Sequence, residues 1–141
     1  MSKKAGSGYV LAFDFGLRNI GVGIGQSVTR TARGIATLKA KDGKPNWREV
    51  LALAAEYGPS RCVVGLPLNM DGSTSNMATR ATRFSDELSM RLQLEVSLHD
   101  ERLTSRSAKA GMEEAQDIGR ASTEHELAAC LILESWFREC G

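Results

Sequence analysis

The first third of the chain shows the short alternating pattern of β-strands. Apolar and β-branched residues are concentrated at 9–15, 20–26 and 31–39, with only a few residues between these runs. Such tight connections favour an antiparallel meander of three strands. Asp42 and Gly43 then predict a turn.

A helical pattern follows the turn. Asn46 is a suitable N-cap, with Glu49 at the third helical position, and Gly58 ends the segment. The apolar stripe is expected to consist of Trp47, Val50, Leu51, Ala54 and Ala55. This spacing predicts an amphipathic helix that packs on the sheet.

Two further strands and a helix complete the central pattern. The continuous apolar run 62–66, stopped by Pro67, is typical of a strand buried on both faces, which indicates parallel pairing. Residues 94–99 alternate and predict a half-exposed strand that finishes at 100–102. Between these strands, helical spacing is shown by Met77, Ala81, Phe84, Leu88 and Leu92.

The two ends of the chain differ in character. A short helix is expected from near Thr104, a flexible polar loop over 114–122, and a last helix over 123–139. Residues 1–8 are small and polar and are predicted to form a disordered tail. The pattern gives an α/β fold, with one domain over 9–139.

Composition narrows the class of protein. The 141 residues are 42% hydrophobic and 25% charged, with no apolar run near the ~20 residues of a membrane span and no signal-peptide core. We therefore expect a cytoplasmic protein without a membrane partner, either monomer or homodimer. The net charge of +1 requires any nucleic-acid binding to use a local patch. Buried reduced thiols are expected at Cys62, Cys130 and Cys140.

One carboxylate lies inside an apolar strand. Burying an ionised Asp14 costs several kcal/mol, roughly, unless it is paired or binds a metal. The alternative is a strand-end aspartate that accepts backbone N–H groups around Gly16. Glycines clear one face of the next strand, which indicates packing of a helix there: Gly21, Gly23 and Gly25.

Four segments resemble the signature motifs of the YqgF/RuvX family of Holliday-junction-resolvase-like nucleases, which are linked to maturation of the 5′ end of pre-16S ribosomal RNA. The resemblance covers residues 9–137 and implies a ribonuclease H-like fold, in which a five-stranded mixed sheet (three antiparallel strands plus two parallel) has helices on both faces. The segments are Ala12-Phe13-Asp14-Phe15-Gly16, Val64-Gly65-Leu66-Pro67-Leu68-Asn69-Met70-Asp71-Gly72, Asp100-Glu101-Arg102-Leu103-Thr104 and Ile132-Leu133-Glu134-Ser135.

The resemblance implies a metal-dependent nuclease using Mg²⁺ or Mn²⁺. Two cations held roughly 4 Å apart by carboxylates neutralise charge at the attacking and leaving oxygens. Asp14 is expected to be the shared ligand. Glu101 is the second candidate, because it closes a strand at the edge where open α/β sheets gather ligands, about 10 Å or two strand spacings from Asp14. Asp100 should point to the opposite face by strand alternation.

The third acid of the family, an aspartate at the start of the last helix, is replaced here by His125. As a neutral imidazole, His125 would favour Mn²⁺ over Mg²⁺; otherwise it is a solvent-exposed histidine of the first turn. The neighbouring Glu124 and Glu126 are alternatives. Glu126 also fits a capping box with Thr123, which would turn its carboxylate back to the helix start.

Several polar residues near the motifs are candidate substrate contacts. Arg18 and Arg102 are expected to meet phosphates, although Arg102 fits equally a role in orienting Glu101 or a surface ion pair. Asn69 and Asp71 lie in a loop on the same edge and have an ordinary turn as the alternative. Further cations flank the motifs, with solvated helix faces as the alternative: Arg80, Arg83, Arg106 and Lys109.

The favoured function is therefore a nuclease that acts on structured RNA in 5′-end maturation of pre-16S ribosomal RNA. A branched-DNA resolvase and a non-catalytic RNA-binding assembly factor with a degenerate metal site are the alternatives. Nucleotide binding of the actin and Hsp70 type also begins with a strand-one Asp-x-Gly, but those proteins clamp the nucleotide between two such domains. This chain holds one such domain and has no GxxxxGK motif. Aromatic residues at 6% make extensive base stacking an unfavoured mode of recognition.

Overall fold

The computed structural model describes residues 8–103 and 123–139. The expected helix near Thr104, the loop over 114–122, residues 1–7, Arg106, Lys109 and Cys140 lie outside this part of the chain. The elements run in the order β1 (Tyr9–Asp14), β2 (Asn19–Gln26), β3 (Thr31–Lys41), β4 (Lys44–Pro45), α1 (Trp47–Tyr57), β5 (Arg61–Leu66), α2 (Asn76–Leu92), β6 (Glu95–Asp100), the 3₁₀ turn η1 (Glu101–Leu103) and α4 (Glu124–Glu139).

The strands form one mixed sheet in the order β4-β3-β2-β1-β5-β6. The antiparallel meander of β1, β2 and β3 is confirmed, and β5 pairs in parallel with both β1 and β6. The predicted number of five strands was wrong by one. The sixth strand, β4, has two residues and pairs with the end of β3 across the turn at Asp42 and Gly43, and it is too short to show an alternating pattern.

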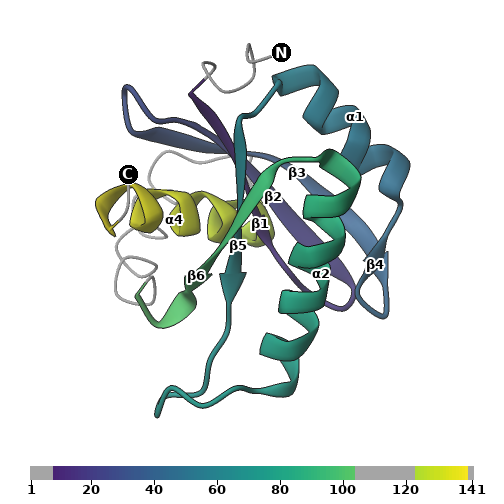
Figure 1. Ribbon diagram of the computed structural model, residues 1–141, viewed down its shortest axis with the longest axis vertical. Coiled ribbons are helices and arrows are strands. Elements are labelled where there is room, and N and C mark those ends of the chain that lie inside the picture. The colour runs from purple at the N-terminus through teal and green to yellow at the C-terminus, as the bar shows by residue number, and fades with distance from the viewer. Residues whose placement is uncertain (1–7, 104–122, 140–141) are drawn as a thin grey trace.

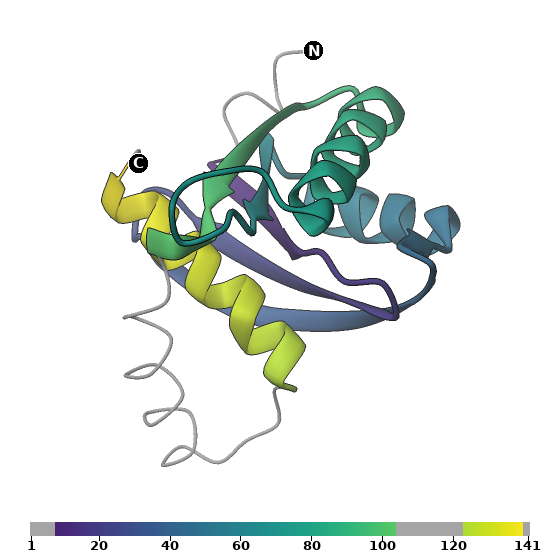
Figure 2. The same cartoon turned by 90° about the horizontal axis from the view of Figure 1, so that it is seen from below.

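Helices cover both faces of the sheet, with α1 and α2 on one side and α4 on the other (Figure 1). The view from below separates these two layers clearly (Figure 2). Strand alternation divides β1 between them. Leu11 and Phe13 enter the core cluster under α1 and α2, whereas Val10 and Ala12 enter the cluster under α4. Asp14 shares the parity of Ala12 and so lies on the α4 face.

The first helix begins as predicted but rotates its stripe. The side chain of Asn46 accepts a hydrogen bond from the backbone N–H of Arg48 (3.0 Å), which caps α1. Leu51 and Ala55 were wrongly placed in the buried stripe, since both are exposed. The side chains that pack on the core are Trp47, Val50, Leu53, Ala54 and Tyr57. Only the side of α1 that faces the sheet is buried, and Leu51 and Ala55 lie outside that side.

The second helix matches its predicted pattern. The Ser75 hydroxyl accepts from the N–H of Ala78 (3.0 Å) and caps α2. All five predicted stripe positions belong to or pack against the core cluster under α1 and α2: Met77, Ala81, Phe84, Leu88 and Leu92.

The glycines of β2 bring α4 close to the sheet. A Cβ at Gly21 would clash with the carbonyl oxygen of His125, and one at Gly23 would lie 3.3 Å from the backbone nitrogen of Cys130. On β3, Gly34 leaves room in the same way for Glu126. The predicted helix packing against this face is confirmed, and it fixes the start of α4 beside the end of β1.

Two smaller expectations concern the thiols and the membrane. Cys62 and Cys130 are buried free thiols, as predicted. In residues 8–103 and 123–139, no helix has both the length and the apolar character needed to cross a membrane.

Candidate active site

Asp14 ends β1 with its carboxylate partly buried on the α4 face. None of the hydrogen bonds within the structure's described ranges involves this carboxylate, so the alternative of a strand-end aspartate bonded to backbone N–H groups is not what the structure shows. The pKa of Asp14 is raised to about 6, and the largest cause is burial. The nearby His125 acts to lower this pKa, and Glu124 acts to raise it. Asp14 is therefore a partly desolvated carboxylate available to a ligand.

Glu101 lies on the same face, two strands away. It is the first residue of η1, directly after β6. A Cβ at Gly65 would clash with its carboxylate oxygen, so this carboxylate extends over β5 at a position without a side chain. Because Val64 pairs with Phe13, the next residues Gly65 and Asp14 lie side by side.

The two carboxylates influence each other. Burial raises the pKa of Glu101 to about 7, and the negative charges of Asp14 and then Asp100 add to this effect. The expected separation of two strand spacings is thus bridged by a glutamate side chain lying over glycine. The close approach of Glu101 to Gly65 was not predicted, although a glycine inside an apolar strand signals close approach by another group.

The residues in the first turn of α4 differ in how they relate to Asp14. Thr123 accepts a hydrogen bond from the N–H of Glu126 (3.0 Å), which is the first half of the predicted capping box. The Glu126 carboxylate, however, accepts from the hydroxyl of Thr37 on β3 (3.5 Å). The structure therefore brings the charges of Glu124 and His125 to bear on Asp14 and directs Glu126 towards β3.

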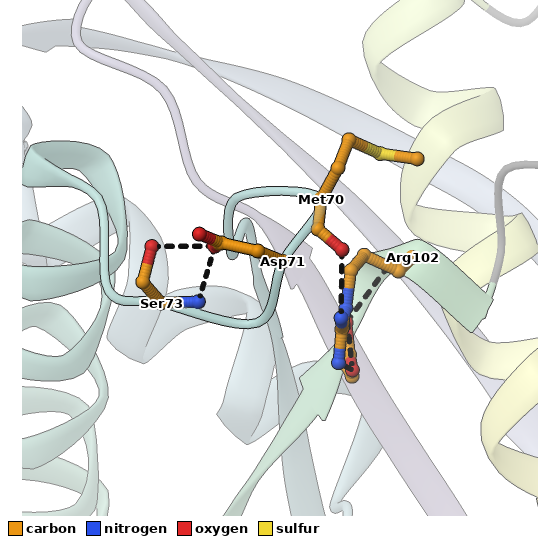
Figure 3. Close-up of polar contacts among 5 residues, drawn as sticks. Met70, Asp71, Ser73 and Arg102 are labelled. Carbon is orange, nitrogen blue, oxygen red and sulfur yellow. Dashed lines mark hydrogen bonds and ion pairs between the residues drawn. The ribbon is translucent and has the colours of Figure 1, made fainter.

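Arg102 binds the residue before Glu101 (Figure 3). Its guanidinium donates to both carboxylate oxygens of Asp100 (Nη2 to Oδ2, 2.7 Å; Nε to Oδ1, 3.1 Å) and to the carbonyl oxygen of Met70 (3.2 Å). Asp100 also accepts from the backbone N–H of Arg102 (2.9 Å). The two residues that flank Glu101, Asp100 and Arg102, are thus bonded to each other. The surface ion pair predicted for Arg102 is made with Asp100.

The loop between β5 and α2 holds itself together. Asp71 accepts from both the N–H (2.9 Å) and the hydroxyl (2.7 Å) of Ser73, and Asn69 donates to the same hydroxyl (2.9 Å). Gly72 adopts a φ of 90° in this turn. Asn69 and Asp71 therefore hold this turn through their polar contacts, and their role as substrate contacts stays a prediction.

The candidate phosphate contacts fall into two groups. Arg80 forms an ion pair with Asp42 (3.1 Å). Arg18, in the turn between β1 and β2, and Arg83, on α2, are exposed.

The donor set suits a hard divalent cation. Within the described ranges, no group of three or more His, Cys, Asp and Glu side chains is arranged to hold a metal ion, so the structure shows no closed cage there. Mg²⁺ and similar ions are nevertheless commonly bound by one or two carboxylates, water and substrate phosphates. The paired carboxylates of Asp14 and Glu101, with pKa values raised by burial and by negative neighbours, fit that mode because a cation would relieve both effects.

Comparison with known proteins shows the family of this chain. A family model described as RuvX, Holliday junction resolvase, matches residues 8–139. A protein of Actinobacillus pleuropneumoniae named "Putative pre-16S rRNA nuclease" is 48% identical over 130 residues, covering 91% of this chain and 95% of the relative. A protein of Pseudomonas paraeruginosa with the same name is 48% identical over 132 residues, covering 92% of each.

Solved structures support the fold. RuvC of Thermus thermophilus in complex with a Holliday junction substrate superposes with a TM-score of 0.59 at 15% identity, covering 94% of this chain and 96% of that one. The yeast mitochondrial Holliday junction resolvase Ydc2 gives a TM-score of 0.50 at 10% identity. The ribonuclease H-like α/β fold is confirmed.

Proposed function

The chain belongs to the RuvX family, and from this premise we propose that residues 9–139 form one nuclease domain that hydrolyses phosphodiester bonds in the 5′-end maturation of pre-16S ribosomal RNA. The observation that carries the proposal is the meeting of Asp14 and Glu101 across Gly65. Structured nucleic acid is the partner, which the protein would meet in the cytoplasm.

Asp14 and Glu101 are the residues that would hold the metal, with His125 or Glu124 at the third position. A bound Mg²⁺ or Mn²⁺ supplies charge neutralisation at the scissile phosphate and a more acidic attacking water. Because the Glu126 carboxylate accepts from Thr37, we leave it out of the proposed ligand set. His125 adds a nitrogen donor, which is better suited to Mn²⁺ than to Mg²⁺.

The protein's own residues prepare this site in two ways. The fork between Arg102 and Asp100 fixes the turn in which Glu101 lies, so the carboxylate stays over Gly65. The raised pKa values of Asp14 and Glu101 mean that each carboxyl group must lose a proton before it can bind a cation. Both carboxyl groups thus lose their protons as the pH rises through about 6 to 7.

The test uses purified protein, Mg²⁺ or Mn²⁺, and two substrates: an RNA carrying the 5′ leader of 16S ribosomal RNA and a four-way DNA junction. Cleavage of the RNA is expected with the wild type and should be lost in Asp14→Asn and Glu101→Gln. The matched control Asp86→Asn removes an exposed carboxylate on α2 and should leave the rate unchanged. Equal cleavage by Asp14→Asn would overturn the proposal.

Branched DNA is the second candidate substrate, favoured by the resolvase description of the family and by the fold shared with RuvC. Faster cleavage of the junction than of the leader RNA would select it. Binding of RNA without cleavage in either metal would instead favour the assembly-factor alternative.

A further inference from the structure

A basic pocket lies close to the proposed metal site, on the other face of the sheet. Its volume is about 380 Å³, and its walls come from β4, α2 and the residue that follows Asp14. That residue, Phe15, belongs to the core cluster under α1 and α2. The pocket and the paired carboxylates are therefore on opposite sides of the same strand end.

The charges that line the pocket do not cancel. Its two carboxylates are both engaged: Asp42 with Arg80 (3.1 Å) and Glu87 with Arg91 (2.8 Å). Two further cations of the lining, Lys44 and Arg83, are exposed, and their side chains take part in no ion pair or hydrogen bond within the described ranges. The pocket thus offers two uncompensated positive charges to an anion.

Aromatic side chains form the apolar floor of the pocket: Phe15, Trp47 and Phe84. The ring of Phe84 lies 5.3 Å from that of Phe15 and 5.6 Å from that of Trp47, measured between centroids. Phe15 and Phe84 are almost fully buried, so they present little surface for stacking a base. An apolar floor lowers the local dielectric constant and strengthens the attraction of the cations for a charged group.

The turn between β3 and β4 fixes the shape of the pocket wall. Asp42 and Gly43 both adopt left-handed backbone conformations, with φ of 53° and 81°. A Cβ at Gly43 would lie 2.8 Å from the ring of Phe15, so this turn is pressed against the pocket floor. The position of Lys44, directly after the turn, follows from that contact.

We propose that this pocket binds a backbone phosphate of the nucleic-acid strand whose scissile bond lies at Asp14 and Glu101, with Lys44 and Arg83 as the phosphate ligands. The proposal rests on the proposed nuclease function. A strand passing from the carboxylates to the pocket crosses the turn between β1 and β2, where Arg18 is exposed. Phosphate contacts of this kind position a strand without reading its sequence.

The test measures the affinity of the full-length protein for a fluorescent RNA carrying the 5′ leader of 16S ribosomal RNA, in EDTA and over a range of KCl concentrations. Lys44→Gln combined with Arg83→Gln should weaken binding severalfold and reduce the slope of log affinity against log salt by about 1, because the one phosphate bound in the pocket loses its cations. Arg33→Gln, near the start of β3 and away from the end of that strand that pairs with β4, is the single-charge control.

A second variant tests for a gain of affinity for the RNA. Asp42→Asn removes the partner of Arg80 and keeps a side chain that tolerates the left-handed conformation. This variant should bind the RNA more tightly than the wild type and with a steeper salt slope, whereas Arg33→Gln should change the slope by less than the double variant.

The outcomes separate the two proposals. If the wild type binds and cleaves the RNA but the double variant keeps its affinity and salt slope, the phosphate pocket is refuted and the nuclease function stands. If inorganic phosphate or ATP binds the pocket while RNA affinity is the same in all variants, the pocket serves a free anion and the proposal is equally refuted. If the wild type neither binds nor cleaves RNA or junction DNA, both proposals fail.

Discussion

Asp14→Asn should make the protein more stable while it abolishes cleavage. The pKa of Asp14 rises from 3.8 to about 6 on folding because burial removes solvent from the carboxylate. The folded state therefore holds this proton more tightly than the unfolded state. The contribution of the Asp14 carboxyl group to the free energy of unfolding is therefore fully present below pH 3.8, and it is lost as the pH rises through about 6.

This change in pKa corresponds to at most about 3 kcal/mol of lost stability at pH 8. Asparagine carries no charge and avoids the loss. We expect the free energy of unfolding of Asp14→Asn to exceed that of the wild type by about 2 to 3 kcal/mol at pH 8 and by less than about 1 kcal/mol at pH 4. Urea denaturation in EDTA at both pH values measures the difference.

Two controls sharpen the experiment. Asp86→Asn, an exposed change on α2, should alter stability by less than about 0.5 kcal/mol at either pH. Added Mg²⁺ or Mn²⁺ should stabilise the wild type and not Asp14→Asn, because only the former retains both carboxylates. A variant less stable than the wild type at pH 8 would refute the reasoning, since it would mean that the carboxylate is held by compensating contacts.

Three further predictions concern the geometry around Glu101. Gly65→Ala should reduce cleavage more than tenfold, because its Cβ would displace the Glu101 carboxylate, and adding it to Glu101→Gln should cause little further loss; independent, additive losses would contradict the shared role. Arg102→Lys keeps the charge but loses the fork on Asp100, so kcat should fall with KM nearly unchanged, whereas a rise in KM alone would make Arg102 a phosphate contact. The cleavage rate at low Mg²⁺ should rise between pH 6 and 8 as Asp14 and Glu101 lose their protons, and saturating metal should shift the midpoint to lower pH; a flat profile would argue against both carboxylates as ligands.

Strand patterning predicted much of the fold and the sheet edge at which the structure places Asp14 and Glu101, the candidate site residues. The alternation of β1 separates Phe13 from Asp14, and the position of Glu101 just after β6 placed it at the same edge of the sheet. These are properties of the backbone period, which a sequence records directly. Prediction was weaker for β4, whose two residues show no period.

Side-chain geometry could not be predicted in the same way. The reach of Glu101 over Gly65, the contact of Arg102 with the carbonyl oxygen of Met70 and the contact of Glu126 with Thr37 each join segments whose spacing depends on tertiary packing. The exchange of Leu51 for Leu53 in the buried stripe of α1 has the same origin, because both are apolar and only the direction of the sheet selects between them.

Anomalous diffraction from crystals soaked in Mn²⁺ tests the proposed metal site most directly. We predict a manganese peak bound by carboxylate oxygens of both Asp14 and Glu101, above Gly65 and facing the start of α4. The peak should vanish in Asp14→Asn crystals treated in the same way. A manganese ion bound elsewhere at pH 8, with neither of these two carboxylates among its ligands, would contradict the assignment.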